Sequence, residues 1–180
     1  LALFAVASAG STNAGATTAA LNGTLLQMFN HGLSAAALFF CVGILASRRN
    51  GQRGLDEFGG VRTAAPIFAG LTGIAMFSSL GLPGLNGFVG EFLIFRGVFG
   101  LTATSAAVAC LGLFATAFFL LTFYQRVFHG PRPPNDTPFR DVFGSEWAVL
   151  ALMFVLGVWP QALLRLINPL VTAWTGALLP

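Results

Sequence analysis

The stretch GLPGLNGFVGEFLIF, residues 81–95, decides the fold of this chain. A proline and four glycines fall within its first ten residues, and long apolar runs precede and follow it. Proline and closely spaced glycines interrupt helices, and a membrane protein tolerates such an interruption where protein covers it or where it lines a water-filled cavity. We therefore predict a membrane helix that is broken at Gly81–Gly87. The residues expected to break it are Pro83, Gly84 and Gly87.

The composition of the chain is that of a polytopic membrane protein. Of its 180 residues, 56% are hydrophobic and 8% are charged, whereas charged residues make up about 25% of a soluble domain. All nine lysine-or-arginine positions are arginine, and the net charge of +3 informs on membrane topology rather than on nucleic acid. Cys41 and Cys110 lie in apolar stretches without the spacing of metal ligands, so we predict no metal site.

Apolar runs separated by polar segments give the order of the predicted spans. The polar segments are residues 11–18, 48–62 and 129–144. We predict one all-α transmembrane region over residues 1–180, with spans at about 1–10 (partial), 19–47, 64–99 (broken), 101–128 and 146–170. A span takes about 20 residues. Because the first run is shorter, we expect the chain to be part of a longer polypeptide that is entered within a helix.

The arginines of the loops give the orientation of the spans. Seven of the nine lie in or beside residues 48–62 and 126–140, and two spans separate these segments, so both should face the same side. Arg96 and Arg165 lie toward the other side. Cytoplasmic loops carry the excess of basic residues. We therefore expect the basic loops to face the cytoplasm across a bacterial inner membrane, or the matrix across a mitochondrial inner membrane as the alternative.

Glu91 follows the predicted break, inside an apolar stretch. A charged side chain at the centre of a bilayer costs about 3 kcal/mol, and ionisable residues inside spans mark ion or proton pathways. Broken helices with charged or polar groups beside the break also form the ion sites of transporters. We interpret Glu91 as a proton-binding residue. The alternative is a buried acid that only holds helices together.

A polar stripe lies in the predicted span 19–47. Gln27, Asn30, His31 and Ser34 recur at helical spacing and should lie along one face. Such a stripe faces the interior of a bundle or a hydrated path, and histidine titrates closest to neutral pH. We expect His31 to transfer protons and the other three side chains to form a polar axis. Hydrogen bonding between helices is the alternative role.

The other ionisable residues are expected to have simpler roles. His129, in a His-Gly-Pro sequence at the end of a span, is interpreted as a helix-end residue near the lipid headgroups. The acids in loops or at span ends should be solvated by water; they are Asp56, Glu57, Asp136, Asp141 and Glu146.

Three segments resemble the antiporter-like subunits of respiratory complex I. They are MFNHGLSAAALF (28–39), LPGLNGFVGEF (82–92) and RVFHG (126–130), in the order of that family. The sister subunits tend to carry lysine where Glu91 stands, so the chain is most similar to the M-type subunit, called NADH dehydrogenase subunit 4 in mitochondria. The resemblance implies an antiporter-like fold with two inverted repeats, of which the chain would cover the second, in the carboxy-terminal part.

The resemblance also implies a function. Glu91 would match the terminal proton site of the family and His31 the histidine of its central hydrophilic axis, in a subunit that translocates protons for NADH:quinone oxidoreductase. NADH, FMN, iron–sulfur clusters and quinone would bind in partner subunits, and no cofactor is expected in this chain. The expected partners are neighbouring antiporter-like subunits, other membrane subunits of complex I and the lipid bilayer, but no nucleic acid.

Two alternatives stay open at this point. Multisubunit Na⁺/H⁺ antiporters and membrane-bound hydrogenases share the fold, and partner proteins or sodium dependence of transport would discriminate them from complex I. The other alternative is a non-conducting membrane scaffold, which a dry, fully packed environment around Glu91 and His31 would favour.

Overall fold

The structure is a computed structural model that describes Val6, residues 13–133 and 139–142, four single positions between 146 and 155, and residues 161–178. Regular structure in this part is helical, which confirms the predicted all-α class. In chain order the elements are α2 (Ala14–Arg48), η1 (Leu55–Glu57), α3 (Val61–Ala64), α4 (Pro66–Ser79), α5 (Asn86–Leu101), α6 (Ala103–Tyr124), the π-helical turn η2 (Gln125–His129) and α8 (Gln161–Leu178). Two stretches, α2 and Ala103–His129, are long and apolar enough to cross a membrane.

Helix α2 begins inside the segment 11–18 that was expected to be a loop. The Oδ1 of Asn13 accepts a hydrogen bond from the Ala16 N–H at 3.0 Å, and Thr17 is buried. A short polar side chain at the N-cap satisfies an N–H of the first turn that has no partner within the helix. The helix therefore starts at Ala14, and the loop prediction was wrong for residues 14–18. Apart from Val6, the predicted partial span 1–10 lies outside the described residues.

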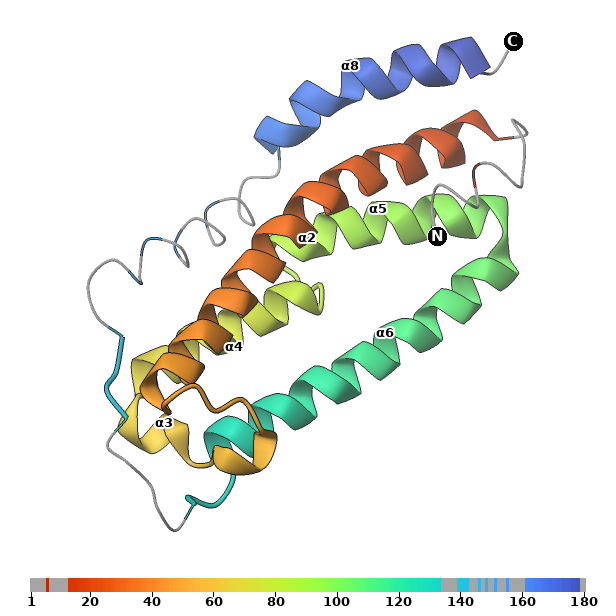
Figure 1. Ribbon diagram of the computed structural model, residues 1–180. Helices are drawn as coiled ribbons and strands as arrows, with labels where there is room; N and C mark the ends of the chain where they lie inside the picture. Colours follow the sequence, from red (N-terminus) through yellow and green to blue (C-terminus); the bar gives the residue numbers. More distant parts are fainter. Residues whose placement is uncertain are drawn as a thin grey trace.

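Helices α4 and α5 form one interrupted crossing beside α2 (Figure 1). With 14 and 16 residues, they are about 21 and 24 Å long, so neither alone covers a hydrocarbon core of about 30 Å. The non-helical segment runs from Leu80 to Leu85. It begins and ends slightly earlier than the predicted break at Gly81–Gly87, because Asn86 and Gly87 already belong to α5.

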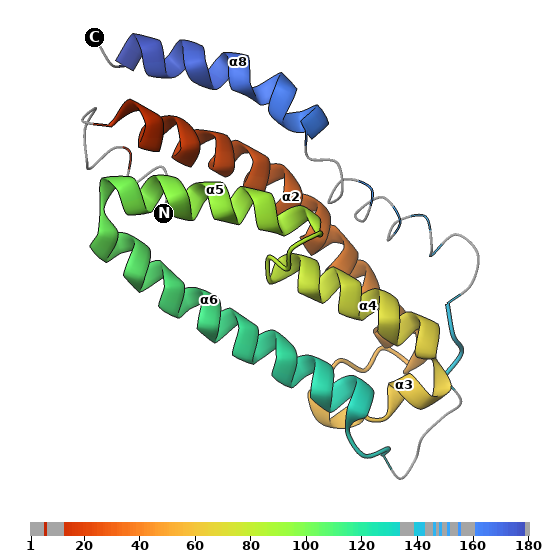
Figure 2. The same ribbon diagram turned by 180° about the vertical axis from the view of Figure 1, so that it is seen from behind.

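The remaining helices lie on either side of this pair. Figure 2 shows α6 returning from the end of α5 to the end of the bundle that holds α3, while α8 lies along the side of α2 away from α5. Helix α8 continues to Leu178, past the predicted end of the last span at Leu170. Most of residues 143–160, which include the predicted start of that span, lie outside the described part.

The largest apolar core among the described residues packs α2 and α4 against α3, η2 and the two basic loops. The ring of Phe68 packs against Phe128 and Phe139, with centroids 5.8 Å apart in both pairs. The hydroxyl of Tyr124 donates to the carbonyl of Ala69 at 3.0 Å, which fixes the end of α6 on α4. Because Gly59 also contacts the carbonyl of Pro131, the two basic loops touch, and the prediction that they share one side is confirmed.

Two acids that were expected to be solvated have structural roles instead. The carboxylate of Asp141 accepts hydrogen bonds from the N–H groups of Ile67 (3.0 Å) and Phe68 (2.8 Å), so it caps α4 from a distant loop. Glu146 forms an ion pair with Arg48 at 3.1 Å. The sequence did not show these contacts because the partners are 73 or more residues apart along the chain. Asp136 lies outside the described residues.

Helices α2 and α5 approach so closely that their contact requires glycine. A Cβ atom at Gly23 would lie 2.6 Å from the amide nitrogen of Ile94. One at Gly97 would lie 2.6 Å from the carbonyl oxygen of Ala16 and 2.7 Å from the Cα of Ala20. Backbone atoms cannot rotate away as a side chain could. Small residues of this kind let membrane helices pack tightly, and here they hold the second half of the broken crossing against α2.

Gly97→Ala should therefore destabilise the protein by about 1–3 kcal/mol, because the added methyl overpacks the contact. The matched control is Gly112→Ala in α6, where a Cβ has no neighbour within 4 Å. That change should be neutral or stabilising by up to about 1 kcal/mol, as alanine favours helix. Thermal unfolding of both variants in mild detergent measures the difference. Equal melting temperatures would contradict the close contact.

Candidate functional site

The first half of the broken crossing ends in a glycine turn. Gly81 has a φ of 66°, its N–H donates to the Ser78 carbonyl at 3.2 Å, and the Leu82 N–H donates to the Phe77 carbonyl at 3.1 Å. This pair of bonds around a left-handed glycine is a Schellman motif, which satisfies carbonyls at the end of a helix. Helix α4 can therefore stop within the membrane without leaving these carbonyls unpaired.

A second turn leads the chain into α5. The Leu85 N–H donates to the Leu82 carbonyl at 3.1 Å, with Pro83 and Gly84 between them and a φ of 91° at Gly84. Proline followed by a glycine of positive φ is the pattern of a type II turn. Gly87 lies in the next turn against the Ser78 carbonyl, where a Cβ atom would collide. The two half-helices therefore touch across the break.

Asn86 joins the break to α2. Its Nδ2 donates to the Asn30 carbonyl at 3.2 Å and to the Ser34 hydroxyl at 3.3 Å, and its Oδ1 accepts from the Ser78 hydroxyl. In return, the side-chain amide of Asn30 donates to the backbone carbonyl of Asn86. Each of the four residues is at most 2% exposed. We call this network the break clamp: Asn30, Ser34, Ser78 and Asn86.

Glu91 lies further along α5, between the break and α2. Its Oε1 accepts a hydrogen bond from the Nε2 of Gln27 at 3.2 Å, and its carboxylate lies against Gly81, where a Cβ atom would collide with it. The side chain is partly buried, and within the described residues no ion pair links it to Arg96 or to another cation. Within the part of the chain that the structure describes, the hydrogen bond to this carboxylate therefore comes from a neutral amide and not from a cation.

His31 lies apart from these contacts. Of the polar stripe, Asn30 and Ser34 belong to the break clamp and Gln27 binds Glu91, whereas the side chain of His31 is exposed. Within the described residues, His31 therefore does not share the buried contacts of the other three positions, and its proton-transfer role stays a prediction. One helical turn separates it from Gln27, and it makes no hydrogen bond within the described part of the chain.

Two members of the break clamp were not predicted as site residues. Asn86 carried a signal, because a polar residue directly after a proline–glycine turn can cap or bridge the broken backbone. Ser78 carried none, since serine is common in membrane helices for packing alone. Its role depends on a partner across the break, which periodicity does not show.

The site offers a titratable group beside an amide that can serve both of its protonation states. An ionised carboxylate only accepts hydrogen bonds, whereas a protonated one also donates. Gln27 already donates to Glu91, and its Oε1 is a buried acceptor without a partner among the described residues. The Gln27 amide therefore has both a donor and an unused acceptor close to Glu91.

Comparison with known proteins identifies the family. Residues 2–118 match the family described as NADH:quinone oxidoreductase/Mrp antiporter, transmembrane. The chain belongs to this family. The resemblance to the antiporter-like M-type subunits is thereby confirmed, together with the membrane character of the chain.

Individual relatives agree with the family match. NADH-quinone oxidoreductase subunit M of Mycobacterium tuberculosis (strain CDC 1551 / Oshkosh) is 40% identical over 159 residues, which cover 86% of this chain and 29% of that protein. Chloroplastic NAD(P)H-quinone oxidoreductase chain 4 of Cryptomeria japonica is 37% identical over 171 residues, covering 87% and 34%. The chain thus spans about a third of the length of these relatives.

A solved structure shows the same arrangement of helices. A chain of respiratory complex I from Thermus thermophilus with bound NADH matches with a TM-score of 0.80 and 30% sequence identity. The match covers 92% of this chain and 36% of that chain.

Asn86→Ala should destabilise the protein by about 1–3 kcal/mol, because it removes hydrogen bonds to two neighbouring segments and leaves buried partners unsatisfied. Asn168→Ala, an exposed position on α8, is the matched control and should change little. Thermal unfolding in mild detergent compares the two. If Asn86→Ala melted like the control, the break clamp would not stabilise the fold.

Proposed function

We propose that the chain is part of an M-type subunit that translocates protons in a bacterial NADH:quinone oxidoreductase of the inner membrane. NADH, FMN, iron–sulfur clusters and quinone would bind in other subunits, and neighbouring antiporter-like subunits would be its partners. One observation carries the proposal. Glu91 is partly buried against a break in a membrane crossing, and among the described residues its hydrogen-bond donor is the Gln27 amide rather than a cation.

The proposed mechanism uses the two states of Glu91. When ionised, its carboxylate accepts the hydrogen bond from the Gln27 Nε2 that is present in the structure. When protonated, it would donate to the Gln27 Oε1, which has no partner among the described residues, once rotation of the amide turns this oxygen toward the carboxyl group. The break places non-helical backbone beside the carboxylate, as in ion sites of transporters. Redox reactions in other subunits would change the hydration of the polar axis, and this would shift the balance between the protonated and the ionised form of Glu91.

His31 is proposed as the residue that passes protons toward Glu91. Its exposed position leaves it accessible to groups outside the described part of the chain, and Gln27 stands one turn away, beside Glu91. No hydrogen bond links His31 to Gln27 or to Glu91 within the described residues, so the transfer would run through hydration rather than by direct contact. Asn30, Ser34 and Gln27 would line the polar axis.

Glu91→Gln should slow proton transfer through this subunit by about 10²-fold or more, the usual contribution of a positioned acid or base. The complex should still assemble, because glutamine keeps the size and hydrogen-bonding ability of the side chain. Proton uptake or release per NADH oxidised, in vesicles of the assembled variant, is the measurement. Glu57→Gln, in the loop element η1, is the control. An assembled Glu91→Gln variant with unchanged stoichiometry would refute an essential role for Glu91.

A subunit of a multisubunit Na⁺/H⁺ antiporter is the second candidate, because the matching family includes Mrp antiporters. Purification of the intact protein in mild detergent, with mass spectrometry of its partners, separates the two. Flavin- and iron–sulfur-bearing subunits would support the complex I proposal. Only small antiporter subunits, together with sodium-dependent transport, would replace it. The non-conducting scaffold gains no support from the described residues, because Glu91 is only partly buried and His31 is exposed among them.

A further inference from the structure

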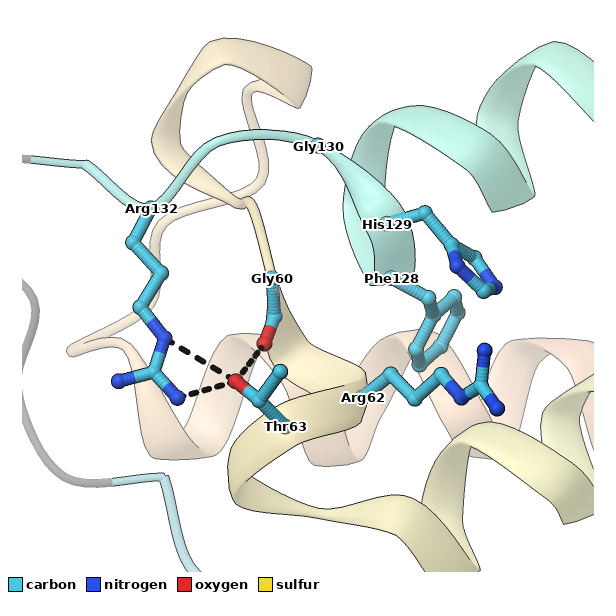
Figure 3. Close-up of a pocket in the computed structure, with 7 residues that line it drawn as sticks. All are labelled: Gly60, Arg62, Thr63, Phe128, His129, Gly130 and Arg132. Atoms are coloured by element: carbon cyan, nitrogen blue, oxygen red, sulfur yellow. Dashed lines mark hydrogen bonds between the residues drawn. The ribbon is translucent and has the colours of Figure 1, made fainter.

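A cavity of about 370 Å³ lies at the basic end of the bundle, where η2 meets α3. Its described lining contains two arginines, Arg62 and Arg132, together with His129, and no acid. Figure 3 shows Arg62 and His129 on one flank and Arg132 on the other. The cavity therefore presents positive charge from two segments that lie far apart in the sequence.

Hydrogen bonds and ring packing fix the walls of this cavity. The hydroxyl of Thr63 donates to the Gly60 carbonyl at 2.7 Å and accepts from the Nε of Arg132 at 3.1 Å. On the other flank, the His129 ring packs on Tyr124 with centroids 5.6 Å apart. Arg62 is exposed and makes no ion pair within the described residues. Arg132 is thus held in place by Thr63, whereas the guanidinium of Arg62 can turn toward a ligand.

The length of the neighbouring span places the cavity at headgroup level. The apolar run Ala103–His129 has 27 residues and is therefore about 40 Å long, close to the 40–45 Å of a bilayer with its headgroups. His129 ends this run and lines the cavity. Along the same helix, Phe118 and Phe119 are 76% and 67% exposed. An apolar surface suited to acyl chains thus leads toward the cationic cavity.

We propose that this cavity binds the phosphate headgroup of an anionic phospholipid, in the leaflet that faces the basic loops. Arginine matches the geometry of phosphate oxygens with two parallel N–H groups, and Arg62 supplies this contact. Arg132 and His129 add donors around it. A soluble phosphate would use the same cations. The apolar surface of α6 favours the lipid, and the proposal does not depend on proton transfer by Glu91.

The test uses the intact protein, stripped of lipid in detergent and titrated with phosphatidylglycerol or phosphatidylcholine, with bound lipid counted by native mass spectrometry. Arg62→Gln should weaken phosphatidylglycerol binding about fivefold, the usual effect of one basic residue near an anionic membrane. Arg62→Lys keeps the charge and should retain most of the affinity. Arg126→Gln removes an exposed cation of η2 that does not line the cavity, so it should bind like the wild type.

The outcomes are decisive in either direction. Selective loss of phosphatidylglycerol in Arg62→Gln alone supports the proposal. An unchanged Arg62→Gln, or an equal loss in Arg126→Gln, would overturn it in favour of diffuse charge attraction. Displacement of the bound lipid by glycerol phosphate at similar concentration would also overturn it, because the ligand would then be a soluble phosphate.

Discussion

The interruption of the crossing formed by α4 and α5 is the constraint on which the rest of the structure depends. A bilayer offers no water to pair with free backbone groups, so a helix can break there only where the protein itself supplies partners. In this chain a Schellman motif at Gly81 and a type II turn at Pro83–Gly84 supply hydrogen-bond partners for some of these backbone groups. The Asn86 side chain links the resumed helix to α2 and to Ser78.

Tight packing and the polar site follow from that arrangement. Glycines at 23 and 97 bring α2 within backbone contact of α5, and this closeness lets Gln27 and Asn30 reach across to the broken crossing. The glycine that ends α4 also lies against the carboxylate of Glu91. A larger residue at Gly81 would both strain the turn and displace the carboxylate. Backbone geometry and the ionisable group are thus coupled at one position.

The sequence was sufficient to predict features that depend on local chemistry and insufficient for those that depend on distant partners. The broken helix, the all-α membrane fold and the shared side of the basic loops follow from proline, glycine and arginine placement. The start of α2 was misplaced because Asn13 caps a segment whose small polar residues suggest a loop. Helical spacing placed His31 on the same face of α2 as Gln27, Asn30 and Ser34. Among the described residues only the latter three form hydrogen bonds with α5, and His31 lies outside that contact. The roles of Ser78 and Asp141 required contacts that no spacing encodes.

The central claim is that Glu91 changes its protonation state while the protein works. Infrared difference spectroscopy of the intact complex, with and without NADH-driven turnover, measures this through the carbonyl stretch of a protonated carboxylic acid. We expect such a band in the wild type, and we expect it to vanish in Glu91→Gln but to persist in Glu57→Gln. A band that is unchanged in Glu91→Gln would show that another group carries the proton, and Glu91 would then be a structural acid beside the break.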